Sequence, residues 1–109
     1  MLNSNSTLGN SQDVMEHLIE HEDDASKGAF FVRKDGQRVA EMTYSRTNAS
    51  LIIIDHTAVD ASLSGQGVGR KLLGALVDWA RRAGIKVVPL CPFAKAQFEK
   101  DSSIRDVLV

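Results

Sequence analysis

Cysteine, proline and aromatic residues are scarce in this chain. Its 109 residues include one Cys, two Pro and 6% aromatic side chains. A single cysteine excludes an intrachain disulfide and is typical of a reducing compartment, so we expect a cytoplasmic protein. No apolar run approaches the length that crosses a membrane, and residues 1–10 lack the apolar segment of a signal peptide. We therefore expect no membrane partner.

An excess of charge of either sign is also lacking. The chain has 13 basic and 14 acidic residues and a net charge of −1 at pH 7. Proteins that bind nucleic acid usually carry a positive excess, so we expect no nucleic-acid partner. With 43% hydrophobic and 25% charged residues, the composition is that of one globular domain with a modest core. We assign that domain to residues 13–109, after a disordered tail of residues 1–12 that is rich in Asn and Ser.

The chain is organised around residues 51–91, whose pattern indicates a strand, a glycine-rich loop, a helix and a second strand. Residues 51–59 begin with four apolar residues and predict a buried strand. An apolar stripe at helical spacing predicts a helix over 67–83, which Gly84 ends. The second strand covers 85–90. A single loop and helix connect the two strands, so we expect the strands to be parallel and the connection to be a right-handed crossover.

Shorter patterns predict the flanking elements. These are strands 29–33 and 38–45, a turn at Asp35-Gly36, and a helix 93–100 begun by Pro92. Residues 14–22 fit either a short amphipathic helix or an edge strand. The prediction is an α/β domain with a mixed, mostly antiparallel sheet, in which 51–59 and 85–90 are the parallel pair.

Three glycines alternate at the start of the central helix, at positions 65, 67 and 69. Glycines leave backbone N–H groups accessible, and the positive end of the helix dipole lies there, so the loop predicts a phosphate or pyrophosphate site. The alternative is a tight turn that binds nothing. Arg70 and Leu72 break the dinucleotide pattern Gly-x-Gly-x-x-Gly, and Arg70-Lys71 after Gly69 breaks the Walker pattern.

The segment Ser64-Gly65-Gln66-Gly67-Val68-Gly69-Arg70 resembles the pyrophosphate loop of the GNAT acetyltransferase superfamily, whose pattern is Arg/Gln-x-x-Gly-x-Gly/Ala. Gly67 and Gly69 fill the two small positions, whereas Ser64 stands where Arg or Gln is usual. Residues 56–59 and 89–93 are similar to a subgroup of very short, single-domain members. The resemblance covers residues 28–100. It implies a minimal GNAT-like fold and favours the strand over the helix within 14–22.

The resemblance implies acetyl-coenzyme A as the ligand and an N-acetyltransferase that acts on an unidentified amine, as a monomer or a weak dimer. It implies cofactor contacts for Ala58, Val59, Asp60, Ala61, Ser64, Gly65, Gln66, Gly67, Val68, Gly69 and Arg70. Residues 58–61 would pair with the pantetheine arm. Arg70 is placed to reach a phosphate; the alternative is that Arg70 and Lys71 are a solvated pair. The alternative is a non-catalytic coenzyme A-binding or protein-interaction module, because so short a chain lacks substrate-side elements.

Four residues are candidates for catalysis, with His56 and Cys91 foremost, and we assign no metal site. Histidine has an intrinsic pKa near neutrality, which makes His56 the best candidate base, with a structural histidine as the alternative. Cys91 is expected at the N-cap of the last helix, where unpaired N–H groups stabilise a thiolate; the alternative is a small core residue. Glu41 and Asp55 are further candidate bases. Strict alternation predicts that Asp55 and His56 face opposite sides of the sheet.

Overall fold

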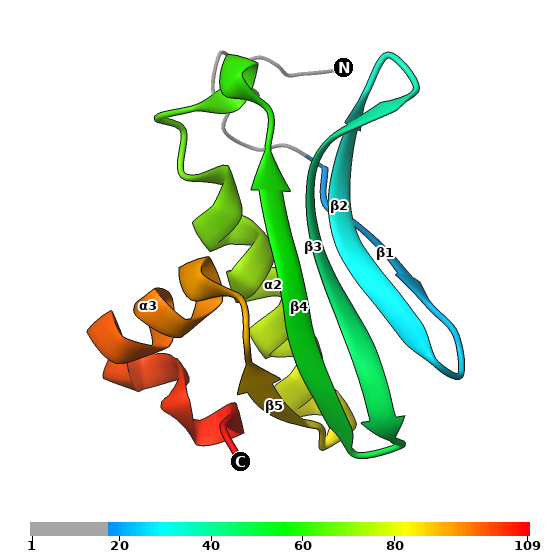
Figure 1. Ribbon diagram of the computed structural model, residues 1–109, viewed down its shortest axis with the longest axis vertical. Coiled ribbons are helices and arrows are strands. Elements are labelled where there is room, and N and C mark those ends of the chain that lie inside the picture. Colours follow the sequence, from blue (N-terminus) through cyan, green and yellow to red (C-terminus); the bar gives the residue numbers. More distant parts are fainter. Residues whose placement is uncertain (1–17) are drawn as a thin grey trace, which may run out of the picture.

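The structure is a computed structural model that describes residues 18–109 (Figure 1). The predicted tail of residues 1–12 lies outside the described residues. In chain order, the elements are β1 (Glu20–Asp23), β2 (Lys27–Lys34), β3 (Gln37–Asn48), β4 (Leu51–Val59), the 3₁₀ helix η1 (Ala61–Leu63), α2 (Val68–Ala83), β5 (Lys86–Pro89), α3 (Pro92–Lys100) and the 3₁₀ helix η2 (Ser102–Val107). None of the helices in this described part is long and apolar enough to span a bilayer.

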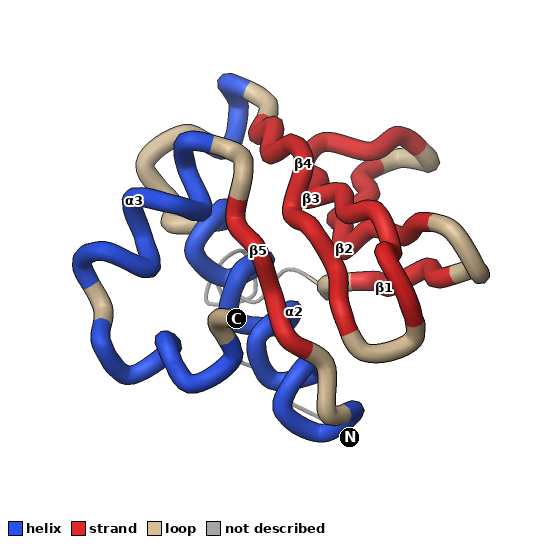
Figure 2. Tube along the Cα trace, turned by 60° about the horizontal axis from the view of Figure 1, so that its bottom comes forward, coloured by secondary structure: helices blue, strands red, loops and turns tan. Residues whose placement is uncertain are grey.

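The described strands form one mixed sheet in the order β1-β2-β3-β4-β5. The first three pairings are antiparallel, and β4 and β5 are parallel, with α2 as the crossover between them. Figures 1 and 2 show α2 against one face of the sheet and α3 beyond β5. These observations confirm the predicted fold class. We call the face toward α2 the inner face and the opposite one the outer face.

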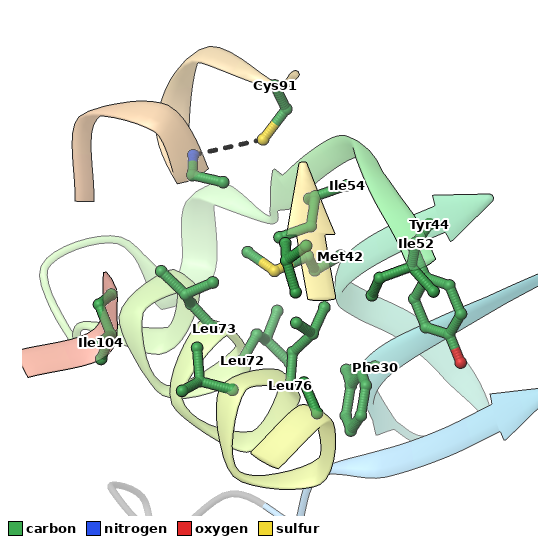
Figure 3. Packing of buried hydrophobic residues seen from close by; sticks show 14 of the residues in the cluster. Phe30, Met42, Tyr44, Ile52, Ile54, Leu72, Leu73, Leu76, Cys91 and Ile104 are labelled. Carbon is green, nitrogen blue, oxygen red and sulfur yellow. Dashed lines mark hydrogen bonds between the residues drawn. The ribbon is translucent and has the colours of Figure 1, made fainter. Parts of the chain in front are cut away.

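The core lies between α2 and the inner face of the sheet (Figure 3). Leu72, Leu73 and Leu76 of α2 are fully buried, as are Ile52 and Ile54 of β4. Leucines at this spacing form the apolar stripe that the sequence predicts, and each buried side chain contributes about 1.5–3 kcal/mol. The helix ends at Gly84, which adopts φ 70° and donates its N–H to the Ala80 carbonyl. The observed helix thus agrees with the predicted one.

Flanking strands are longer than their sequence patterns indicate. β2 and β3 pair from Lys27↔Ser45 to Lys34↔Gln37, and Asp35 and Gly36 turn the chain with φ 52° and 80°. The ambiguous N-terminal segment contains a strand, β1, at the edge of the sheet. The strand interpretation is therefore confirmed for the part of 14–22 that the structure describes.

A β-bulge in β4 changes which side chains share a face. Thr43 pairs with His56 while Tyr44 pairs with Ile54, so Asp55 is an extra residue in the ladder. Asp55 bonds to the hydroxyl of Ser45, and His56 lies near Glu41; both partners are on the outer face. The predicted alternation, with Asp55 and His56 on opposite faces, is wrong because the extra residue interrupts the period of two.

The chain ends beside β5. Phe98, Ile104 and Val107 are buried and join the core from the side of α3 and η2. Leu108 then forms a parallel bridge with Val87, and the N–H of Val109 donates to the Val87 carbonyl. This last segment covers part of the edge of β5 that does not pair with β4.

Candidate functional site

The two parallel strands separate halfway along β4. Their register runs from Leu51↔Lys86 to Ile54↔Pro89. The Ile54 carbonyl accepts the N–H groups of Leu90 at 3.0 Å and of Cys91 at 3.1 Å, after which the chain turns into α3. Residues 55–59 continue β4 without a β5 partner in the described chain. We call this stretch the open edge; it lies at the carboxyl ends of the parallel strands, where α/β units bind ligands.

The loop after the open edge is anchored at two points. The Asp60 carboxylate caps η1 by accepting from the backbone N–H of Ser62 at 2.9 Å and from its hydroxyl. These two hydrogen bonds hold the pKa of Asp60 below its ordinary value. Leu63 is buried in the core. The loop is therefore fixed in front of α2.

The three glycines of the loop have two different functions. Gly65 and Gly67 have φ 82° and 69°, which other residues rarely adopt, and no described atom lies within 4 Å of where their Cβ atoms would be. A Cβ on Gly69 would instead lie 2.9 Å from the ring of Phe93 in α3. Two glycines thus shape an open loop, and the third allows α2 to pack closely on α3.

The N-terminus of α2 lacks a side-chain cap among the described residues. Its N-cap is Gly67, and the N–H of Lys71 makes the first helical bond, to the Gly67 carbonyl. By contrast, α3 is capped by the Cys91 sulfur and η2 by the Asp101 carboxylate. The first N–H groups of a helix have no partner within the helix, so this end suits an anion.

The Arg70 side chain is directed away from that end. Its guanidinium forms an ion pair with Asp101, at the junction of α3 and η2. It passes Gly74, whose added Cβ would lie 4.0 Å from the Arg70 Nη1. An alanine Cβ would therefore fit beside this ion pair at an ordinary distance, and neither the structure nor the sequence gives a reason for a glycine there. The guanidinium would have to leave Asp101 to meet the expected phosphate.

His56 projects from the open edge onto the outer face, with 58% of its side chain exposed. Its Nε2 lies 3.8 Å from the Glu41 carboxylate, which is too long for a hydrogen bond. Arg38 holds that carboxylate at 3.3 Å and also binds Glu22 at 2.6 Å, and its guanidinium lies over Phe31. The structure therefore brings two candidate bases, His56 and Glu41, close together.

A cavity of about 540 Å³ opens on the outer face beside this group. Four carboxylates line it, from Glu22, Asp23, Asp24 and Asp55, together with the cationic side chains of Lys27 and Arg38. Arg46 and the Tyr44 hydroxyl hydrogen-bond to Asp23 and lower its pKa. The balance of charge around the cavity is negative and favours a cationic group.

Cys91 lies on the other side of the open edge. It is 5% exposed and belongs to the core cluster, and its sulfur accepts the Ala94 N–H at 3.3 Å, so it is the N-cap of α3 as expected (Figure 3). The same sulfur lies 3.2 Å from the hydroxyl oxygen of Thr57. Thr57 pairs with Met42, an inner-face residue, so Cys91 and His56 flank β4 from opposite faces.

Two residues of this region were missed by sequence reasoning. Thr57 lies inside the 56–59 motif and Asp101 directly follows the predicted helix 93–100, but neither is among the sequence-predicted site residues. Their partners, Cys91 and Arg70, are 34 and 31 residues away in the chain. No local pattern records such pairs. The position of Thr57 next to His56 was the one signal available.

Comparison with known proteins identifies relatives. The family model of the GCN5-related N-acetyltransferases matches residues 29–107. A GCN5-like protein from Staphylococcus aureus, solved by NMR, is 40% identical with a TM-score of 0.65, and the match covers 83% of this chain and 87% of that one. A search of curated proteins found no match.

Two more distant structures show the same fold. The ribosomal-protein-alanine N-acetyltransferase of Brucella melitensis biovar Abortus is 23% identical with a TM-score of 0.57, over 71% of this chain and 63% of that one. YhbS of Escherichia coli, solved in complex with CoA, is 24% identical with a TM-score of 0.55, over 65% of this chain and 44% of that one. This chain thus spans less than two thirds of either protein.

The family match begins in β2 and ends in η2, and so includes the open edge, the glycine loop and Cys91. The match to the Staphylococcus aureus protein extends over most of both chains. The chain therefore belongs to the GCN5-related N-acetyltransferase family.

Proposed function

We propose that this protein binds acetyl-coenzyme A and transfers its acetyl group to an amine. The observation that carries the proposal is the continuity of the open edge of β4 with the uncapped N-terminus of α2. An extended chain can add to a strand edge, and a pyrophosphate can accept hydrogen bonds from helix N–H groups. Acetyl-coenzyme A carries an extended pantetheine arm and a pyrophosphate in one molecule. Residues 58–61 and 64–70 would hold it.

Bound acetyl-coenzyme A supplies the acetyl group as a thioester; transfer forms a C–N bond, breaks the C–S bond and leaves one proton to move from the amine to the coenzyme A sulfur. On the outer face, His56 would take the amine proton, with Glu41 beside it. On the inner side, Cys91 would give a proton to the departing sulfur. Backbone N–H groups of residues 55–59 that face the open edge rather than β3 would be available to the thioester oxygen.

The acceptor would approach from the outer face. His56 is exposed there, and the neighbouring cavity is lined by carboxylates. A cationic amine fits this charge. We place the reaction in the cytoplasm, with the protein as a monomer or weak dimer, as its single cysteine and the resemblance led us to expect.

Binding can be tested with a matched pair of glycine variants. Gly67→Asp puts a carboxylate at the uncapped start of α2, where it should repel the pyrophosphate and weaken acetyl-coenzyme A binding at least tenfold in calorimetry. Gly84→Asp is the control, because Gly84 ends the same helix with the same backbone conformation, φ 70° against 69°. Equal affinities of the two variants would contradict the proposal.

Turnover is tested by release of free thiol from acetyl-coenzyme A with a panel of small amines and peptides. His56→Ala should lower kcat by about 10²-fold, as for loss of a general base, with little change in affinity. Equal rates in both proteins across pH 6 to 9 would remove His56 from the mechanism.

A non-catalytic module that binds coenzyme A is the second candidate. It is favoured by the 3.8 Å between the His56 Nε2 and the Glu41 carboxylate, which is too long for the hydrogen bond that would orient a general base. Binding without turnover on any amine of the panel would support it.

A further inference from the structure

We propose that Thr57 is a positioning residue that holds the Cys91 sulfur at the open edge and stabilises its thiolate. In the proposed function the Cys91 thiol gives its proton to the departing sulfur and becomes that thiolate; this use rests on the proposed function, but the positioning does not. Thr57 belongs to β4 beyond its last pair with β5, and Cys91 begins α3. Their contact therefore joins the two elements at the place where they separate.

The sulfur is held from two sides. The Ala94 N–H of α3 donates to it at 3.3 Å, and the Thr57 hydroxyl lies at 3.2 Å from β4. The backbone is fixed as well, since the Cys91 N–H donates to the Ile54 carbonyl at 3.1 Å. With 5% of Cys91 exposed, water has little access to take the place of these groups.

A hydroxyl suits both protonation states of the sulfur. It can accept the S–H of a thiol, and by rotating it can donate its own hydrogen to a thiolate, without a change in heavy-atom positions. The Ala94 N–H donates in either state. The thiolate would receive two hydrogen bonds, which are stronger when the acceptor is charged, so the pair favours the anion.

Four titratable side chains of the neighbouring elements lie on the outer face, are exposed or pair with another residue. Asp55 and His56 of β4 lie on the outer face, across the strand from the sulfur. Lys95 of α3 is exposed. Arg70 of α2 is paired with Asp101. Among the described residues, Thr57 and the α3 backbone are therefore the hydrogen-bond partners of the sulfur that can shift its ionisation.

The test is a titration of the thiolate absorption band in the folded protein. The chain has one cysteine, so the signal reports Cys91 alone. It also has one tyrosine, and burial raises the pKa of Tyr44, which keeps the tyrosinate band out of the titration range. Unfolding curves recorded in parallel ensure that every variant is folded throughout.

Thr57→Val removes the hydroxyl and keeps the shape, and should move the titration midpoint to higher pH by about one unit, as for one hydrogen bond to a charged group. Thr57→Ser keeps the hydroxyl and should titrate as the wild type does. If the valine variant does not fold, Thr57→Ala is titrated in its place, because it also removes the hydroxyl. The control is Thr43→Val on the outer face, which should leave the midpoint unchanged.

Equal midpoints for the wild type and the variants without a hydroxyl would overturn the proposal, as would a serine variant that titrates like the valine variant. The titration uses no acetyl-coenzyme A. A protein that shows the expected midpoints but no turnover would support the positioning role and contradict the transferase, so the two failures are distinguishable.

Discussion

Gly28 shows how one missing side chain shapes the edge of the sheet. Its position on β2 is opposite Tyr44 on β3, and an added Cβ would lie 2.3 Å from the Tyr44 hydroxyl and 2.5 Å from the Glu22 carbonyl. Tyr44 cannot move freely, because its hydroxyl binds Asp23 and His21. Gly28→Ala should therefore lower the free energy of unfolding by about 1–3 kcal/mol in urea titrations.

Gly74→Ala is the matched control for that substitution. An added Cβ there meets the Arg70 side chain at an ordinary distance of 4.0 Å, in the middle of a helix. Alanine should stabilise this position by about 0.5–1 kcal/mol. If both alanine variants were as stable as the wild type, neither close packing at Gly28 nor helix propensity at Gly74 would determine stability here.

Single residues were predicted from the sequence only where a local rule applies. Gly84 and Pro92 stand where helix-ending and helix-starting rules place them. The sequence does not show that Gly65 and Gly67 serve the loop conformation whereas Gly69 serves helix packing. Gly69 leaves space for the ring of Phe93, which is distant in the chain. The face predicted for Asp55 is wrong because a β-bulge depends on both strands of a pair, and the sequence of one strand does not show it.

At the scale of an element, β1 is attached by its pairing with β2 and by one histidine. The ring of His21 stacks on Phe30 with centroids 3.9 Å apart and meets the edge of Trp79 at 4.7 Å. The Tyr44 hydroxyl donates to Asp23 at 2.8 Å, so it accepts from the His21 Nε2–H at 2.7 Å. A four-residue strand is thereby attached to the core of the sheet by aromatic contacts.

Burial lowers the pKa of His21, with Arg46 adding to the effect and Asp23 and Glu22 opposing it. A histidine whose folded pKa lies below its unfolded value of about 6.5 binds its proton more readily when unfolded. The protein should thus lose stability as the pH falls from above 6.5 through the folded pKa. We expect this loss in urea titrations between pH 7.5 and 5.5.

His21→Phe separates this histidine from the other titrating groups. Phenylalanine keeps the aromatic contacts with Phe30 and Trp79 but carries no proton, so the variant should lose less stability than the wild type over the same pH range. His56 is present in both proteins, so any contribution it makes to the pH dependence cancels in the comparison. An identical pH dependence would show that His21 does not couple β1 to pH.

Elements were predictable in proportion to their length and periodicity. β4 and α2 have long apolar patterns and were placed to within one residue. β1 has the sequence Glu-His-Glu-Asp and no apolar residue, because it is attached by its pairing with β2 and by the contact of His21 with aromatic rings of other elements. The predicted strands 29–33 and 38–45 are shorter at both ends than β2 and β3.

At the scale of the molecule, stability and binding occupy different places. The core lies between α2 and the inner face, where Leu76 has no exposed surface. The open edge lies beyond it, and the apolar residues near it remain exposed, with Val59 at 37% and Leu90 at 62%. Exposed apolar side chains beside a proposed ligand slot contribute little to folding and can contact a ligand.

This separation predicts opposite effects for two leucine substitutions. Leu76→Ala should lower the free energy of unfolding by about 2–5 kcal/mol, which is a large share of the stability of a small domain, and should leave acetyl-coenzyme A affinity unchanged in the folded protein. Leu90→Ala should change stability by less than about 0.5 kcal/mol, because an exposed leucine has little burial to lose, and should weaken the binding of acetyl-coenzyme A. Urea titration and calorimetry on both variants measure the two quantities. A Leu90→Ala protein that unfolds easily but binds normally would mean that the end of β5 belongs to the core and that the ligand lies elsewhere.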